Sequence, residues 1–168
     1  MKYLLMISFL FWAGLAHGEE NKNQFKVAGR TFEVPSSWKV EKPSSRMRKA
    51  QYKNGKAEIV VFYFGAGSGG SVEANVDRWI GQFKEPKDKL SAKVEKVDVK
   101  KSKITTVSAK GTYMSGSPFG QKVPMPNYAM RGAIIECEGG PIFIKMTGPI
   151  DKVLSSAKSF DRTVRSGL

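Results

Sequence analysis

A glycine-rich segment stands where a nucleotide-binding loop would begin. Gly65, Gly67 and Gly70 follow an apolar, β-rich run and precede a segment typical of an amphipathic helix, so they match the G-x-G-x-x-G fingerprint. The backbone N–H groups of such a loop, together with a helix N-terminus, favour a phosphate or another anion. The sequence therefore predicts an anion-binding site at Gly69, Gly70 and Ser71. The alternative is a connection that only lets the helix pack closely.

A dinucleotide is not expected at this loop. Dinucleotide-binding units continue into a parallel strand with an acidic residue about 20 positions after the loop. Here that position falls in residues 87–93, which are rich in lysine and contain Asp88 as their one acid. We therefore predict no dinucleotide and no other cofactor.

A second pair of residues suited to anions is Arg46 and Arg48. Both fall on one face of a strand predicted at residues 46–52, and Tyr52 falls on the same face. Arginine beside an aromatic ring can bind a polyanion or stack on a sugar or a base. Arg46 and Arg48 are thus anion-binding candidates. The alternative is an edge strand protected by its charges.

The first 18 residues have the layout of a secretory signal peptide. Lys2 precedes an apolar run at residues 3–15, and Ala16 and Gly18 place small residues before a cleavage site. The run is shorter than the roughly 20 residues that span a membrane, and no later stretch is comparable. We expect residues 1–18 to be removed and residues 19–168 to form one domain, exported to the periplasm or secreted, without a transmembrane span.

Few residues remain for catalysis or for metal binding. His17 is the only histidine and Cys137 the only cysteine, so histidine-dependent nucleophiles, the common zinc and copper ligand sets and intrachain disulfides are excluded from residues 19–168. Cys137 is expected to be a buried, unreactive thiol. We predict no catalytic residues, no metal and no familiar enzymatic activity.

Carboxylate chemistry is the enzymatic alternative, because acid–base pairs need only Asp or Glu. Glu136 and Glu138 lie two positions apart on a predicted strand and so share a face. Their simpler interpretation is a solvent-facing pair. A hydrolase acting on envelope polysaccharide remains the alternative function, to be favoured by two acidic residues in one deep pocket.

The chain is strongly basic, with a net charge of +13 that becomes +12 once Lys2 is removed with residues 1–18. Much of the excess lies in residues 84–110. Such a charge favours anionic partners: envelope polysaccharide, lipid headgroups or an acidic protein. The alternative is that the lysines only keep the protein soluble.

Strands and helices follow from hydrophobic periodicity and turn residues. Apolar stripes predict helices at residues 72–83 and 153–164. Asn54-Gly55 and Gly139-Gly140 predict tight hairpins, and the nearly continuous apolar run at residues 57–64 predicts a central strand buried on both faces. A hairpin is expected at residues 25–34, and a sheet of about six strands at residues 46–52, 57–64, 94–99, 104–113, 128–137 and 142–147.

This order predicts an α+β fold: a mostly antiparallel sheet of about six strands, with two amphipathic helices packed on it in two or three layers. The segment from Phe32 to Trp38 (F-E-V-P-S-S-W) resembles the F-x-V-P-x-x-W opening of domains in the PsbP/Mog1-like superfamily, as does the order of elements. That superfamily contains a photosystem extrinsic subunit, a nuclear-transport cofactor and many exported bacterial proteins. The resemblance implies a non-enzymatic binding or assembly module and transfers no functional residues. With the predicted signal peptide, we expect an exported module of this kind in the cell envelope.

Overall fold

The computed structural model describes residues 23–100, 102–116 and 120–168. The predicted signal peptide lies outside these residues. The described residues form nine strands and two helices: β1 (Gln24–Val27), β2 (Arg30–Glu33), β3 (Lys39–Val40), β4 (Arg48–Asn54), β5 (Ala57–Tyr63), α1 (Val72–Ile80), β6 (Ser91–Val99), β7 (Ser102–Ser115), β8 (Val123–Ile135), β9 (Ile142–Pro149) and α2 (Ile150–Ser166). Neither helix is long and apolar enough to cross a membrane.

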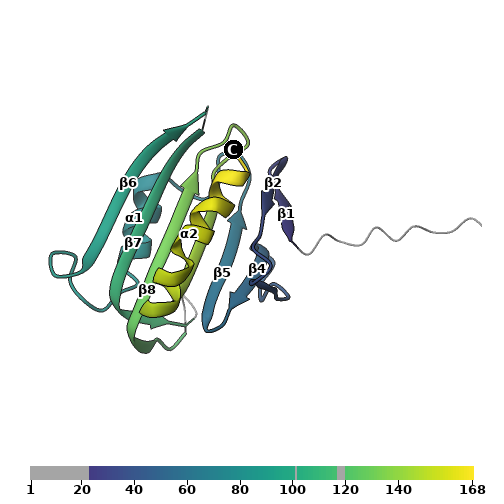
Figure 1. Cartoon of the computed structure of the whole chain (residues 1–168). Helices are drawn as coiled ribbons and strands as arrows, with labels where there is room; N and C mark the ends of the chain where they lie inside the picture. The colour runs from purple at the N-terminus through teal and green to yellow at the C-terminus, as the bar shows by residue number, and fades with distance from the viewer. Residues whose placement is uncertain (1–22, 101, 117–119) are drawn as a thin grey trace, which may run out of the picture.

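Seven strands form one antiparallel sheet in the order β3-β4-β5-β9-β8-β7-β6, while β1 and β2 form a separate hairpin. In Figure 1, α2 lies in front of this sheet, along β8, and α1 passes behind it. The predicted α+β fold is confirmed, with three layers and one strand more than the six expected for the sheet. The three pairings between consecutive strands β6 to β9 make one meander.

The central strand is β9, which corrects the expectation that residues 57–64 would be central. Five consecutive residues of β9, from Ile142 to Met146, are buried. In β5, Glu58, Phe62 and Tyr63 are only half-buried. For Glu58 and Phe62, which lie on the α1 side, the reason is the position of α1: its core is built on β7, β8 and β9, and Phe62 is only partly buried against it. Tyr63 lies on the opposite face of the sheet, paired with Ile142.

Tight turns form where the sequence predicts them. Gly55 has a φ of 59° between β4 and β5, a conformation that glycine adopts without strain. Gly140 has a φ of 106°, and a Cβ there would overlap the backbone of Gly65. The Gly139-Gly140 turn therefore also seats the glycine-rich loop against the β8–β9 hairpin.

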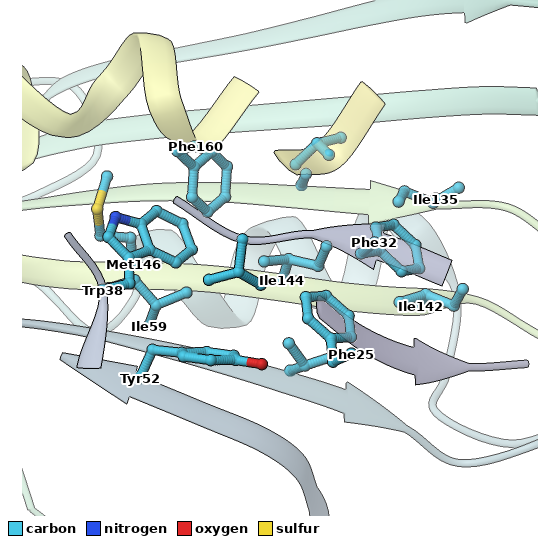
Figure 2. Packing of buried hydrophobic residues seen from close by; sticks show 14 of the residues in the cluster. Phe25, Phe32, Trp38, Tyr52, Ile59, Ile135, Ile142, Ile144, Met146 and Phe160 are labelled. Atoms are coloured by element: carbon cyan, nitrogen blue, oxygen red, sulfur yellow. The ribbon is translucent and has the colours of Figure 1, made fainter. Parts of the chain in front are cut away.

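The larger core lies between the sheet and α2. Figure 2 shows the ring of Phe160, from α2, directed at Ile144 of the central strand, with Phe25, Phe32 and other rings around it. Phe25 and Phe32 stack with their ring centroids 4.7 Å apart. Phe32, Val34 and Trp38 are all buried, so the apolar residues of the F-x-V-P-x-x-W segment serve to seal this core.

The smaller core lies on the opposite face, under α1, and its centre is Trp79. This ring is 4% exposed and meets Phe143 edge-on at 6.3 Å between centroids. Gly132 of β8 lies directly beneath it, since a Cβ at that position would overlap the indole ring. The apolar stripe of the predicted helix is thus confirmed as its buried face, although α1 ends at Ile80 and Phe83 instead bridges to Tyr113 of β7.

Candidate functional site

Polar groups of the predicted anion-binding loop form hydrogen bonds within the loop and with the first turn of α1. Ser71 caps α1 by accepting a hydrogen bond from the N–H of Ala74 at 3.1 Å. The side chain of Asn75 donates to the carbonyls of Gly69 and Ser71 at 2.7 and 2.8 Å. Gly70 and Ser71 line a surface cleft, whereas Gly69 is held against the ring of Phe143.

That cleft has a volume of about 690 Å³ and lies between the start of α1, the β6–β7 ribbon and the β8–β9 turn. Its charged residues are Glu73, Lys96, Asp98, Lys103 and Glu136, two basic and three acidic. Lys96 pairs with Glu73 at 3.2 Å. The cleft is therefore no strongly positive pocket, and the strand after α1 is the antiparallel edge strand β6, not the parallel strand of a dinucleotide site.

Glu73, one of the three acidic residues of this cleft, lacks the raised pKa of a general acid. A hydrogen bond from the backbone of Glu73 and its contacts with Lys96 lower the pKa of the Glu73 carboxyl, the opposite of what a general acid needs. Glu136 and Glu138 are exposed and follow the end of β8, so the predicted strand at residues 128–137 ends two residues earlier. Among the described residues, no three His, Cys, Asp or Glu side chains are grouped to hold a metal.

Arg46 and Arg48 do not share a strand face, contrary to the prediction. Arg46 lies in the turn before β4, and the register of β4 shifts between Arg48 and Ala50. This irregularity places Arg48 on the α1 side of the sheet, over the ring of Phe62, while Tyr52 enters the core beneath α2. Arg48 also pairs with Glu58 at 2.9 Å.

Cys137 is half-buried, a partial correction to the buried thiol expected from the sequence. Burial raises the pKa of its thiol, and nearby Arg30 only partly opposes this effect. Fewer thiolates form at neutral pH as a result, which agrees with the expected low reactivity.

An exposed basic surface lies where α2 leaves the sheet uncovered, and we call it the open sheet face. It consists of the α2-side residues of β6 and β7, Arg131 of β8 and the adjoining side of α2. Lys93, Ser108 and Arg131 lie opposite one another on three neighbouring strands. Arg131 binds Asp161 of α2 through two hydrogen bonds of 2.8 and 2.6 Å, which fixes this row on the α2 side. In Figure 1 this part of the sheet lies beside α2.

Basic residues outnumber acidic ones on the open sheet face. The basic residues are Lys93, Lys110 and Arg131 on the strands and Lys158 and Arg165 on α2; the acidic residues are Glu95 and Asp161. Lys158 and Arg165 lie three positions before and four after Asp161, and so on the same side of the helix. Both acids are already paired, Glu95 with Lys93 and Asp161 with Arg131. Lys110, Lys158 and Arg165 make no ion pair with any described residue and remain free for an anion.

A buried lysine is the feature that the sequence analysis missed. Lys145 of β9 is 8% exposed, and its Nζ donates to Oε1 of Gln82 at 2.6 Å and to the hydroxyl of Tyr113 at 3.1 Å. A signal was present, because Lys145 stands between Ile144 and Met146 in an otherwise apolar strand. Its partners, 63 and 32 positions away in the chain, could not be identified without the fold.

Burial determines the protonation of both Lys145 and Tyr113. Loss of hydration lowers the pKa of Lys145 to about 7, partly opposed by the nearby carboxylate of Glu58. Loss of hydration also raises the pKa of Tyr113 to about 12. Nζ contacts only neutral acceptors, so the protonated lysine has no direct counter-ion.

Comparisons with known proteins relate the chain to others through its structure. The solution structure of cyanobacterial PsbP (CyanoP) from Synechocystis sp. PCC 6803 is similar, with a TM-score of 0.53 and 12% identity, over 85% of this chain and 89% of that one. A protein of unknown function from Pseudomonas aeruginosa aligns with a TM-score of 0.41 and 11% identity, over 86% and 94%. No family model and no curated protein matches the sequence. The fold is therefore PsbP-like, as the resemblance in the sequence predicted.

Proposed function

We propose that this protein is an exported, non-enzymatic binding module that holds anionic polysaccharide of the cell envelope on its open sheet face. The observation that carries the proposal is the set of Lys110, Lys158 and Arg165, three exposed cations on one surface without an ion-pair partner among the described residues. The PsbP-like fold and the net charge of +13 agree with such a role.

The shape of the surface favours an extended polymer. The strands present an extended strip on which Thr106 and Ser108 place hydroxyl groups beside Glu95 and Lys93 of β6, with Lys110 next on β7. Hydroxyl groups can donate to sulfate, carboxylate or sugar oxygens, and the cations at the margins supply attraction without fixed geometry. Each contact is weak, so binding depends on several charges at once.

Binding to an anionic polysaccharide is expected to fall steeply from low to physiological salt, because exposed charges are screened beyond about 8 Å at physiological ionic strength. Reversing both Lys110 and Lys158 to Glu should weaken binding by up to about thirtyfold, since each of the two exposed ion pairs that are lost contributes up to ~1 kcal/mol. The matched control is Lys39→Glu with Lys56→Glu, which changes the net charge equally at the β3–β5 end of the sheet.

The measurement is the dissociation constant of the purified protein for the polysaccharide at two salt concentrations. Equal loss in both double variants would show that net charge, not the open sheet face, causes binding. Retention on acidic liposomes but not on polysaccharide would assign the surface to lipid headgroups instead. Turnover of a glycoside, abolished by Glu136→Gln, would overturn the non-enzymatic assignment.

Export is part of this proposal and rests on the predicted signal peptide. Protein recovered from outside the cytoplasm is expected to begin at Glu19. Its intact mass is the measurement, and a mass that retains Trp12 would contradict cleavage at this site. Deletion of residues 2–18 should keep the protein in the cytoplasm.

A further inference from the structure

The two edges of the sheet differ greatly in length. One edge strand, β3, has two residues, whereas the other, β6, has nine and pairs with β7 alone among the strands that the structure describes. Every residue of β6 except Val99 is exposed. A long edge strand with unpaired N–H and C=O groups is a template for another strand, so its side chains decide which strand can pair there.

The side chains of β6 carry charges of alternating sign. Lys93 and Glu95 lie on the α2 side of the sheet, Lys96 and Asp98 on the α1 side. The strand is therefore neutral within a chain of net charge +13. A run of lysines would repel a second copy, but this pattern gives each face of the strand one cation followed by one anion.

We propose that two copies of this chain associate through β6, pairing antiparallel about a two-fold axis at Val94. An axis perpendicular to the sheet keeps each residue opposite one on the same face. Centred on Val94, the pairing runs from Ser91 to Val97 and places Lys93 of each copy opposite Glu95 of the other. Since Lys93 already contacts its own Glu95 at 2.7 Å, the four charges alternate around a square.

Other positions of the two-fold axis give less favourable pairing, either in charge or in the length of the paired segment. An axis at Lys93, Glu95 or Lys96 sets two like charges against each other, which is destabilising for directly opposed residues. An axis at Val97 also pairs opposite charges, but it leaves only residues 95–99 in register. The Val94 register additionally brings two exposed valines together, each 43% exposed in the single copy. This inference goes beyond the proposed function and does not depend on it.

Disulfide trapping tests the register directly. With Cys137→Ser as background, Val94→Cys places two cysteines directly opposite, where Cα atoms about 4.5–5.5 Å apart lie within disulfide reach. Ala92→Cys, on the same face of β6, is the matched control, because its mate in this register is Lys96 and not itself. Under mild oxidation we expect Val94→Cys to form covalent dimer about tenfold faster than Ala92→Cys, with a rate that rises with protein concentration.

Charge exchange supplies a second readout. Lys93→Glu or Glu95→Lys alone should slow the trapping of Val94→Cys, and the two together should restore it, because each pair again joins opposite charges. Equal trapping of Val94→Cys and Ala92→Cys, faster trapping at Val97→Cys, or no rescue by the double exchange would overturn the proposal. Val94 lies on the α1 side, so polysaccharide binding by the reduced variant tests the open sheet face separately.

Discussion

Replacing Lys145 with methionine is expected to stabilise the protein at neutral pH by about 1–4 kcal/mol. Burial lowers the pKa of Lys145 from its ordinary value of 10.5 to about 7, so folding must desolvate or deprotonate this amine. Methionine fills nearly the same volume without that cost. The hydroxyl of Tyr113 can still donate a hydrogen bond to Oε1 of Gln82, at 3.3 Å. Gln82 and Tyr113 therefore each keep a hydrogen-bond partner when Lys145 is replaced.

The gain should depend on pH in a direction that identifies its cause. Between pH 7 and pH 10.5 the unfolded chain holds a proton on Lys145 that the folded chain has released, so the stability of the natural protein rises with pH. Below pH 7 the penalty is complete. From pH 7 to 9.5 the advantage of Lys145→Met should therefore shrink, by up to about 3 kcal/mol at about 1.4 kcal/mol per pH unit.

Urea unfolding at several pH values between 6 and 9.5 measures this effect. The upper limit avoids the titration of Tyr113, whose pKa of about 12 in the folded protein makes stability fall above pH 10. Glu58, Arg48, Arg78 and Lys122 also act on Lys145 and are present in both proteins. Lys56→Met, at an exposed turn, is the control. Parallel pH profiles for the natural protein and Lys145→Met would show that Lys145 is not desolvated.

Trp79→Ala is expected to destabilise the protein by about 3–5 kcal/mol, a large part of the roughly 5–15 kcal/mol typical of a folded domain. The ring is the centre of the core under α1, where it covers Gly132 and contacts Phe143. Chemical denaturation gives the free energy of unfolding. Leu154→Ala removes a side chain that is 51% exposed, and its effect should stay within about 0.5 kcal/mol.

Gly132→Ala tests which face of α1 meets the sheet. In the natural protein the added methyl group must displace the indole of Trp79, at a cost of about 1–3 kcal/mol. In a Trp79→Ala background the space is empty, so the same change should cost much less, and the double variant should be more stable than the two single effects predict. Additive effects would mean that the two residues are not in contact.

The features that the sequence predicted correctly depend on neighbouring residues. The turn at Asn54-Gly55 and the cap at Ser71 need only local backbone preferences. The apolar stripe from Val153 to Val164 determines the buried face of α2 without any distant information. The same holds for the buried Phe32 and Trp38, whose motif suggested the superfamily.

What could not be predicted depends on residues that are distant in the chain. The register shift after Arg48, which separates it from Tyr52, follows from pairing with β5. The central place of β9 depends on how the two halves of the sheet pair, and the two partners of Lys145 come from the loop after α1 and from β7. The open sheet face was also missed, because it combines residues of β6, β7, β8 and α2 that share no local pattern.

The order of strands has a consequence for how the chain reaches this structure. Strands β3 to β5 and β6 to β9 each pair with near neighbours, but the two halves are joined by β5 and β9, where Tyr63 meets Ile142 and Glu58 meets Thr147. The entropy lost in closing so long a loop comes before the contacts between β5 and β9 can stabilise the chain. Topologies with such distant contacts fold slowly. During synthesis this joint cannot form before β9 emerges, so the two halves of the sheet stay apart until most of the chain has been made.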